Sequence, residues 1–221
     1  MRHSVPTLCL AALLYGGPGP RAAEGPPPGF ASLFNGKDLS GWQVNAGGKL
    51  DRWGAAGGLL FTRGGGGGWL MTEQEYEDFE LRLEFRLPKA GNSGVALRSA
   101  LTGAPHLEAG MEVQILDDPW YLDERNYKGL KPTQRAGALY GVVPPAKDAL
   151  RPTGRWNVFR IVARGRHLTV ELNGTRVVDT NLDDHLAAAK EHAGILRTRG
   201  HIGLQSHDGR VDFRRLYVKR L

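Results

Sequence analysis

Cysteine is nearly missing from this 221-residue chain. The single one, Cys9, lies in an apolar stretch close to the amino terminus. The rest of the chain therefore has no disulfide, no thiol nucleophile and no thiolate ligand for a metal.

Long hydrophobic runs are also missing, because the longest apolar stretch, 5–15, is too short to span a bilayer comfortably. It follows Arg2 and His3 and precedes a segment rich in glycine and proline, a pattern that resembles a secretory signal peptide. We expect a signal peptide over 1–23, a linker over 24–28 and one domain over 29–221. Export is favoured over a disordered cytoplasmic tail.

Runs of one charge are absent, although the formal net charge is +6. Lysine and arginine alternate with acidic residues, so no basic track for a phosphate backbone exists and we expect no nucleic-acid partner. The glycine run at 63–69 lacks the Gly-Lys-Ser/Thr ending of a phosphate loop, and no helix follows it. We therefore expect a flexible hairpin loop there and no nucleotide cofactor.

Helical periodicity is scarce, and only the segment around 182–191 has a helix-forming composition. The sequence FELRLEFRL at 79–87 alternates apolar with charged residues, which predicts a strand with one buried face. Asn173-Gly174 separates two β-rich runs and predicts a two-residue hairpin turn. These features predict an all-β protein built of antiparallel strands, either a two-sheet sandwich or a barrel.

Unusual polar residues share faces on several of the predicted strands. In GMEVQILDD, at 110–118, Glu112 and Gln114 share one face, and Gln205 and His207 do so in GLQSHDG. Arg98 lies opposite Val95 and Leu97 in a third run. Such faces are often merely solvated, but amides, carboxylates and guanidinium groups with aromatic rings nearby are typical of a carbohydrate site.

Several chemistries can be tested against the sequence. It has no Gly-x-Ser-x-Gly elbow and no His-Glu-x-x-His motif. A pair of catalytic carboxylates could be formed by Glu112 and Asp117, although the sequence does not give their separation. A divalent cation is an alternative, with Glu112, Asp117 and His207 as candidate ligands, or Asp208 in place of Asp117.

Seven ordered motifs together resemble the 3-keto-disaccharide hydrolase family, formerly a domain of unknown function. They cover nearly all of 29–221 and read GFASLFNGKDLSGWQ, GNSGVALRS, GMEVQILDD, GALYGVVPP, GRWNVFRIVARG, LNGTRVV and GHIGLQSHDGRVDFRRLYVKRL. The resemblance implies a jelly-roll sandwich of the concanavalin type, exported by bacteria that process glycans. It also implies a carbohydrate substrate already oxidised at C3 of a sugar ring, supplied by a separate sugar oxidoreductase.

This chemistry needs neither a serine elbow nor a zinc-binding helix, which is consistent with the absence of both motifs. A carbonyl at C3 acidifies the C2 proton, so one base can remove it, the group at C1 can leave by elimination, and water can then add. The resemblance places proton transfer on Glu112 and His207 and a turn at 92–94. Substrate binding is assigned to Asn92, Arg98, Gln114, Trp120, Tyr140 and Gln205.

Two positions depart from the family pattern. LQSHDG replaces the usual LQDHG, so that Ser206 stands where an acid is common and Asp208 is inserted, and Arg215 replaces an asparagine. The first departure lies beside the candidate site and puts the activity in doubt. Two alternatives to an enzyme therefore remain: a non-catalytic carbohydrate-binding module of the cell envelope, and an envelope interaction domain.

Overall fold

The computed structural model describes residues 25–66 and 68–221. The predicted signal peptide and the first residue of the predicted linker lie outside the described residues. Within the described ranges, no helix combines the length and the apolar character that a membrane crossing requires.

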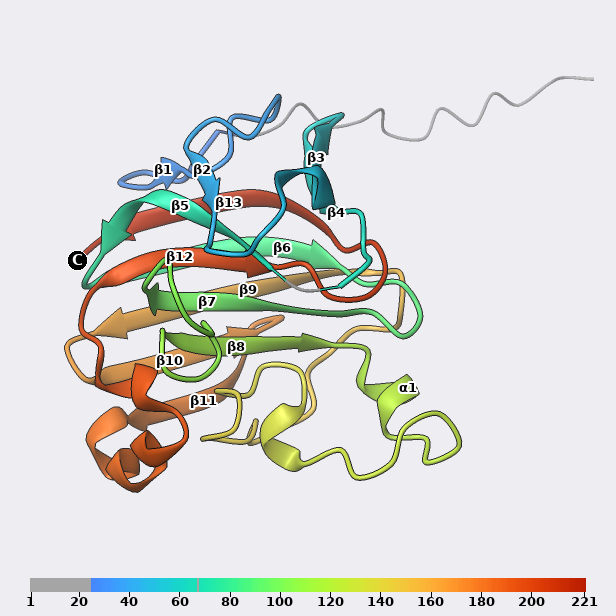
Figure 1. The fold of residues 1–221 in the computed structure, drawn as a ribbon, viewed down its shortest axis with the longest axis vertical. Helices are drawn as coiled ribbons and strands as arrows, with labels where there is room; N and C mark the ends of the chain where they lie inside the picture. The colour runs from blue at the N-terminus through green and yellow to red at the C-terminus, as the bar shows by residue number, and fades with distance from the viewer. Residues whose placement is uncertain (1–24, 67) are drawn as a thin grey trace, which may run out of the picture.

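Two antiparallel β-sheets form a sandwich (Figure 1). The larger sheet has the order β11-β10-β9-β6-β13-β4-β3, with β1 also paired to β13. Its strands are β1 (Ala31–Ser32), β3 (Trp53–Ala56), β4 (Leu59–Thr62), β6 (Phe79–Arg86), β9 (Trp156–Arg164), β10 (His167–Leu172), β11 (Thr175–Asn181) and β13 (Asp212–Arg220). The predicted all-β jelly-roll sandwich is confirmed.

The smaller sheet has the order β2-β5-β12-β7-β8. Its strands are β2 (Trp42–Val44), β5 (Trp69–Tyr76), β7 (Asn92–Ser99), β8 (Met111–Leu116) and β12 (Gly200–Gln205). One α-helical turn and four 3₁₀ segments connect the strands in the described chain: η1 (Leu50–Arg52), α1 (Asp118–Tyr121), η2 (Pro132–Gln134), η3 (Leu182–Lys190) and η4 (Ala193–Leu196). The predicted helical segment is thus present as η3.

The core lies between the two sheets, and β6 follows the predicted alternation. Phe79, Leu81, Leu83 and Phe85 are almost fully buried, and the ring of Phe85 lies 4.9 Å from that of Phe159 on the neighbouring strand. Each such side chain contributes roughly 1.5–3 kcal/mol by leaving water.

Charged side chains on the outer face of β6 form ion pairs with neighbouring residues. Glu80 contacts Arg82 at 2.7 Å and Arg160 at 2.8 Å, and Glu84 accepts hydrogen bonds from Arg214 and Arg215. The alternation on this strand therefore separates the core from a network of charges on the outer surface.

Turn chemistry explains one predicted connection and corrects another. Asn173 and Gly174 have φ of 53° and 81° between β10 and β11, which is the positive-φ pair that a type I′ turn needs. The predicted turn at 92–94 is wrong, because these residues begin β7 and pair with β8.

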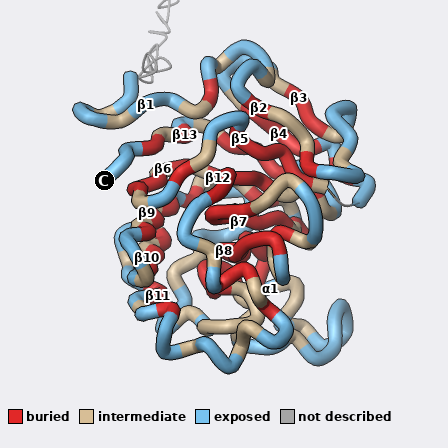
Figure 2. The backbone as a smooth tube through the Cα atoms, turned by 60° about the vertical axis from the view of Figure 1, so that its left-hand side comes forward, coloured by how far each residue is buried: buried red, intermediate tan, exposed pale blue. Residues whose placement is uncertain are grey.

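β8 is the edge strand of the smaller sheet, and the chain segment that follows it pairs with that edge. The backbone N–H of Gly137 donates to the carbonyl oxygen of Gln114 at 2.8 Å, and the backbone N–H of Tyr140 donates to the carbonyl oxygen of Glu112 at 2.9 Å. Every residue of β8 is buried as a result. Figure 2 shows the buried strands β12, β7 and β8 beside the paler connections around α1. The backbone edge of β8 is therefore paired and not open to water.

Candidate active site

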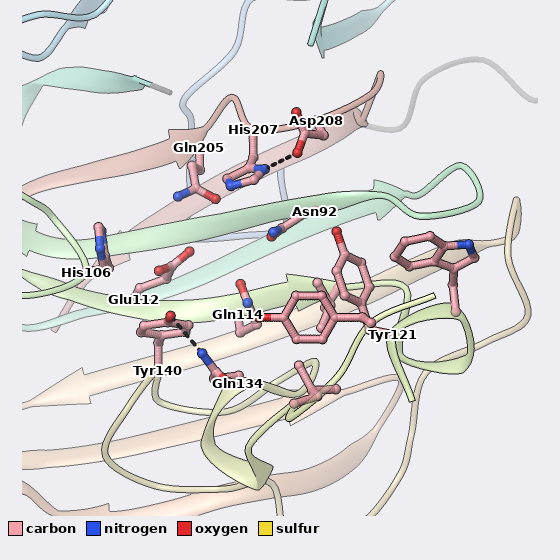
Figure 3. A pocket seen from close by; sticks show the side chains of 14 residues that line it. Asn92, His106, Glu112, Gln114, Tyr121, Gln134, Tyr140, Gln205, His207 and Asp208 are labelled. Carbon is pink, nitrogen blue, oxygen red and sulfur yellow. Dashed lines mark hydrogen bonds and ion pairs between the residues drawn. The ribbon is translucent and has the colours of Figure 1, made fainter. Parts of the chain in front are cut away.

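A pocket of about 520 Å³ lies on the outer face of the smaller sheet. Side chains from β7, β8 and β12, and from the connections after α1 and β12, reach into it (Figure 3). It gathers seven of the predicted site residues: Asn92, Glu112, Gln114, Trp120, Tyr140, Gln205 and His207. Its size and mixed lining suit a sugar ring.

Glu112 lies at the bottom of this pocket. It is 3% exposed, and its Oε1 atom has no hydrogen-bond partner. Burial disfavours the charged carboxylate and raises the pKa of Glu112 to about 8. Gly94 makes room for it, since a Cβ at that position would lie 1.7 Å from Oε1. The site therefore holds a carboxyl group that exchanges its proton close to neutral pH.

Tyr140 lies beside Glu112 on the covering segment. Its hydroxyl oxygen accepts a hydrogen bond of 3.1 Å from Nε2 of Gln134, which leaves the hydroxyl proton available to a ligand. Its ring packs edge-on against His106 at 5.7 Å and lies 6.4 Å from His192. These contacts fix the direction in which the hydroxyl group points.

His106 lines the same pocket, and the sequence analysis did not identify it. Its Nδ1 atom is buried without a hydrogen-bond partner, and burial lowers the pKa of the imidazole. A neutral imidazole can donate from one nitrogen and accept at the other. The signal for this residue is weak, because His106 lies in an irregular loop without strand periodicity.

His207 and Gln205 approach the pocket from the end of β12 (Figure 3). Nδ1 of His207 lies 2.9 Å from Oδ2 of Asp208, within ion-pair distance, although the angles do not meet those of a hydrogen bond. The His207 side chain is 43% exposed. The inserted acid of this chain, Asp208, thus lies next to the candidate proton-transfer histidine.

Aromatic side chains form one end of the pocket. Trp120 and Tyr121 pack at 4.7 Å with an angle of 75° between their rings, and Tyr121 meets Tyr127 at 5.3 Å. Tyr121 and Tyr127 both belong to the connection that follows β8, and Tyr127 was not predicted. Such rings can pack on the apolar CH face of a sugar.

The prediction that Arg98 binds substrate is wrong. Its guanidinium group is fully buried and donates hydrogen bonds to the carbonyls of Glu77 and Gly165 and to Asp78, at 2.7–3.1 Å. The backbone φ of Arg98 is 51°, so strand alternation fails at this residue. Arg98 instead ties two strand connections to the end of β7.

The expected cation ligands are brought together only in part, because Glu112, His207 and Asp208 line the pocket and Asp117 does not. Asp117 accepts hydrogen bonds from the backbone of Ala90 and the hydroxyl of Thr153, at 2.8 and 2.7 Å, so its carboxylate links the connection before β7 to the connection before β9. Across 25–66 and 68–221, no group of three or more His, Cys, Asp and Glu residues has the arrangement of a metal site. The cation set that includes Asp117 and the carboxylate pair of Glu112 and Asp117 are therefore not assembled in this pocket, and the set with Asp208 lacks the arrangement of a metal site.

Comparison with known proteins identifies relatives over most of the chain. The model of the 3-keto-alpha-glucoside-1,2-lyase-like domain matches residues 29–219. A Bacteroides thetaiotaomicron protein named 3-keto-disaccharide hydrolase is 25% identical over 87% of this chain and 79% of its own length.

Solved structures with the same fold also cover most of the chain. A candidate glycosyl hydrolase from Parabacteroides distasonis is 26% identical, with a TM-score of 0.76 over 87% of this chain and 94% of that one. The carbohydrate-binding module CBM66 from Bacillus subtilis shares the fold at 13% identity, with a TM-score of 0.52 over 81% and 95% of the two chains. The chain belongs to the 3-keto-alpha-glucoside-1,2-lyase-like family.

Proposed function

We propose that this protein cleaves glycosides whose sugar ring carries a carbonyl at C3, with Glu112 as the base that removes the C2 proton. The observation that carries the proposal is the buried Glu112 carboxyl group, unpaired at Oε1 and raised in pKa to about 8. A base whose pKa lies near the working pH is ionised in a useful fraction of the molecules and is still basic enough to remove the proton.

The proposed reaction has two stages. Glu112 takes the C2 proton, and the electron pair of the C–H bond moves toward the C3 carbonyl to give an enediolate. The enediolate collapses to a C1–C2 double bond as the C1–O bond breaks, and the leaving oxygen takes up a proton. Water then adds to C1 and a proton returns to C2, which completes a net hydrolysis.

Neighbouring side chains supply the remaining roles. Tyr140 can donate its hydroxyl proton to the C3 oxygen as negative charge develops there. The proton is available because Gln134 donates a hydrogen bond to the Tyr140 hydroxyl oxygen and does not accept one from it. His207, near the mouth and beside Asp208, is the proposed donor to the leaving oxygen. Asn92, Gln114 and Gln205 can bind ring hydroxyls, while Trp120 packs on the ring.

The direct test is turnover of a purified protein with a 3-keto-disaccharide. We expect release of two monosaccharides, and no cleavage of the same disaccharide before oxidation, because its C2 proton is not acidic. Saturable binding of the unoxidised sugar without any cleavage of the keto form would instead identify a carbohydrate-binding module.

The substrate must come from an oxidation at C3, so we propose that a separate sugar oxidoreductase supplies it. We also propose export to the bacterial envelope, supported by the charged start and the short apolar stretch of the sequence. Amino-terminal sequencing of the protein from fractionated cells should find a chain that begins near residue 24, in the envelope fraction or the medium.

Gly94→Ala is expected to lower kcat by at least ~10-fold, because misplacing a reacting group costs rate steeply. The added methyl group would occupy the space of the Glu112 carboxyl group, whose Oε1 lies 1.7 Å from the position of that Cβ. Steady-state kinetics on the 3-keto-disaccharide check this. Gly25→Ala is the control, since its methyl group meets no atom within 4 Å. Unchanged kcat in Gly94→Ala would mean that the position of Glu112 does not matter to the reaction.

A further inference from the structure

A second groove adjoins the candidate active pocket. Its volume is about 560 Å³, and it shares His106, Gln205 and His207 with that pocket. The two histidines therefore form a common boundary between two spaces, each large enough for one sugar ring. A substrate of two rings can place its scissile bond at this boundary.

The walls of the groove are three connections tied to the sheet. Asn45 is buried, and its side-chain oxygen accepts the backbone N–H of Trp69 at 2.9 Å. Gly66 donates its N–H to the carbonyl of His207 at 3.1 Å, which joins the glycine run directly to the active pocket. The prediction of a hairpin loop is wrong, because the glycine run connects β4 of the larger sheet to β5 of the smaller sheet, and Gly65 and Gly66 line the groove.

Glycine is required at one point of this wall. Gly65 has φ of 82°, and a Cβ there would lie 2.3 Å from Nη1 of Arg52. The glycine run therefore leaves the guanidinium group of Arg52 in place at the side of the groove.

The charge of the groove is positive. Lys49 and Arg52 line it, and its described lining residues include no aspartate and no glutamate. Arg52 donates one long hydrogen bond, 3.4 Å, to the carbonyl of Gly64, and its buried Nε atom has no hydrogen-bond partner. A donor that is desolvated and unpartnered gains free energy when an acceptor occupies the groove.

We propose that this groove binds the leaving part of the substrate and selects a leaving sugar that carries a carboxylate, as a uronic acid does. The proposal rests on the cleavage proposed above. Lys49 and Arg52 would bind the carboxylate, while the C3-oxidised ring occupies the pocket of Glu112. Guanidinium groups bind carboxylates through paired hydrogen bonds, which favours this anion at Arg52.

The test compares two 3-keto-disaccharides that differ in the leaving sugar, glucose or glucuronic acid. Wild-type protein should show kcat/KM at least ~5-fold higher for the acidic substrate at low salt, since exposed charge pairs contribute about 1 kcal/mol. The double variant Lys49→Gln/Arg52→Gln should lose that preference, because KM for the acidic substrate should rise to the value for the glucose substrate. Lys147→Gln/Arg164→Gln removes the same charge at exposed positions outside the groove and should keep the preference.

The outcomes separate this inference from the proposed function. Equal kcat/KM for the two leaving sugars in wild-type protein, with clear turnover of both, overturns the groove assignment and leaves the cleavage intact. If neither substrate is cleaved, calorimetry with the unoxidised disaccharides decides. Tighter binding of the acidic one that the double variant loses supports the charge selection, and equal affinities refute it. The single variant Lys49→Gln, at an exposed residue, guards against a folding defect from the loss of Arg52.

Discussion

Glu112→Gln is expected to reduce kcat for the 3-keto-disaccharide by at least ~10²-fold, because an amide cannot accept the C2 proton. Glutamine keeps the shape of the buried side chain, so the substrate should still bind with a similar Kd. Single-turnover kinetics and equilibrium binding measure the two effects separately. In wild-type protein kcat should rise with pH through about 8, as Glu112 loses its proton.

The same substitution has a predicted effect on stability. The folded-state pKa of Glu112 is raised from 4.5 to about 8, so the native protein retains a proton that the unfolded chain has lost between these values. Because of this group, the free energy of unfolding of the wild-type protein falls by roughly 3 kcal/mol from pH 4 to pH 7. The glutamine variant has no titrating group at this position and does not lose this stability. Denaturant unfolding across this pH range should show a widening gap in favour of the variant. A gap that does not change with pH would contradict the burial of an ionisable Glu112.

Arg98→Met is expected to destabilise the fold by about 3 kcal/mol, which is one of the largest effects in the chain. The substitution removes three hydrogen bonds from a fully buried guanidinium group and leaves the carbonyls of Glu77 and Gly165 without this donor. Thermal unfolding should show a Tm lower by about 10 °C. KM for the keto substrate should not change, because Arg98 does not line the pocket.

Arg155→Met is the matched control for that substitution. Arg155 is exposed, so its loss should shift Tm by no more than about 2 °C. The structural assignment of Arg98 would be contradicted by the reverse pattern, in which Arg98→Met keeps its Tm and raises KM.

Strand alternation predicted those parts of the fold and site that depend on regular backbone. It correctly placed Glu112 beside Gln114 on one face of β8, since a regular strand sends every second side chain to one face. Gln205 ends β12 and His207 follows it outside the strand, yet both reach the pocket as predicted. Strand alternation failed at Arg98, because a single residue with positive φ redirects the side chain toward other partners. The positive φ values at Asn173 and Gly174 were predictable, because an Asn-Gly pair between two strands is typical of a type I′ turn.

Irregular connections account for the site residues that the sequence analysis missed. His106, Tyr127 and Gln134 reach the pocket from loops and a short helical turn, where neither a period of two nor one of 3.6 applies. The burial of Glu112 was also unpredictable, because it arises when the segment around Tyr140 pairs with the β8 edge. Strand periodicity alone could not distinguish this face from a solvated one.

The central claim is that Glu112 removes the C2 proton, and proton exchange in D₂O tests it most directly. Early in the reaction, ¹H NMR of the released keto sugar should show deuterium at C2 with wild-type protein. Glu112→Gln should incorporate it at least ~10²-fold more slowly. Cleavage that leaves the original hydrogen at C2, or equal exchange rates in the two proteins, would contradict the account.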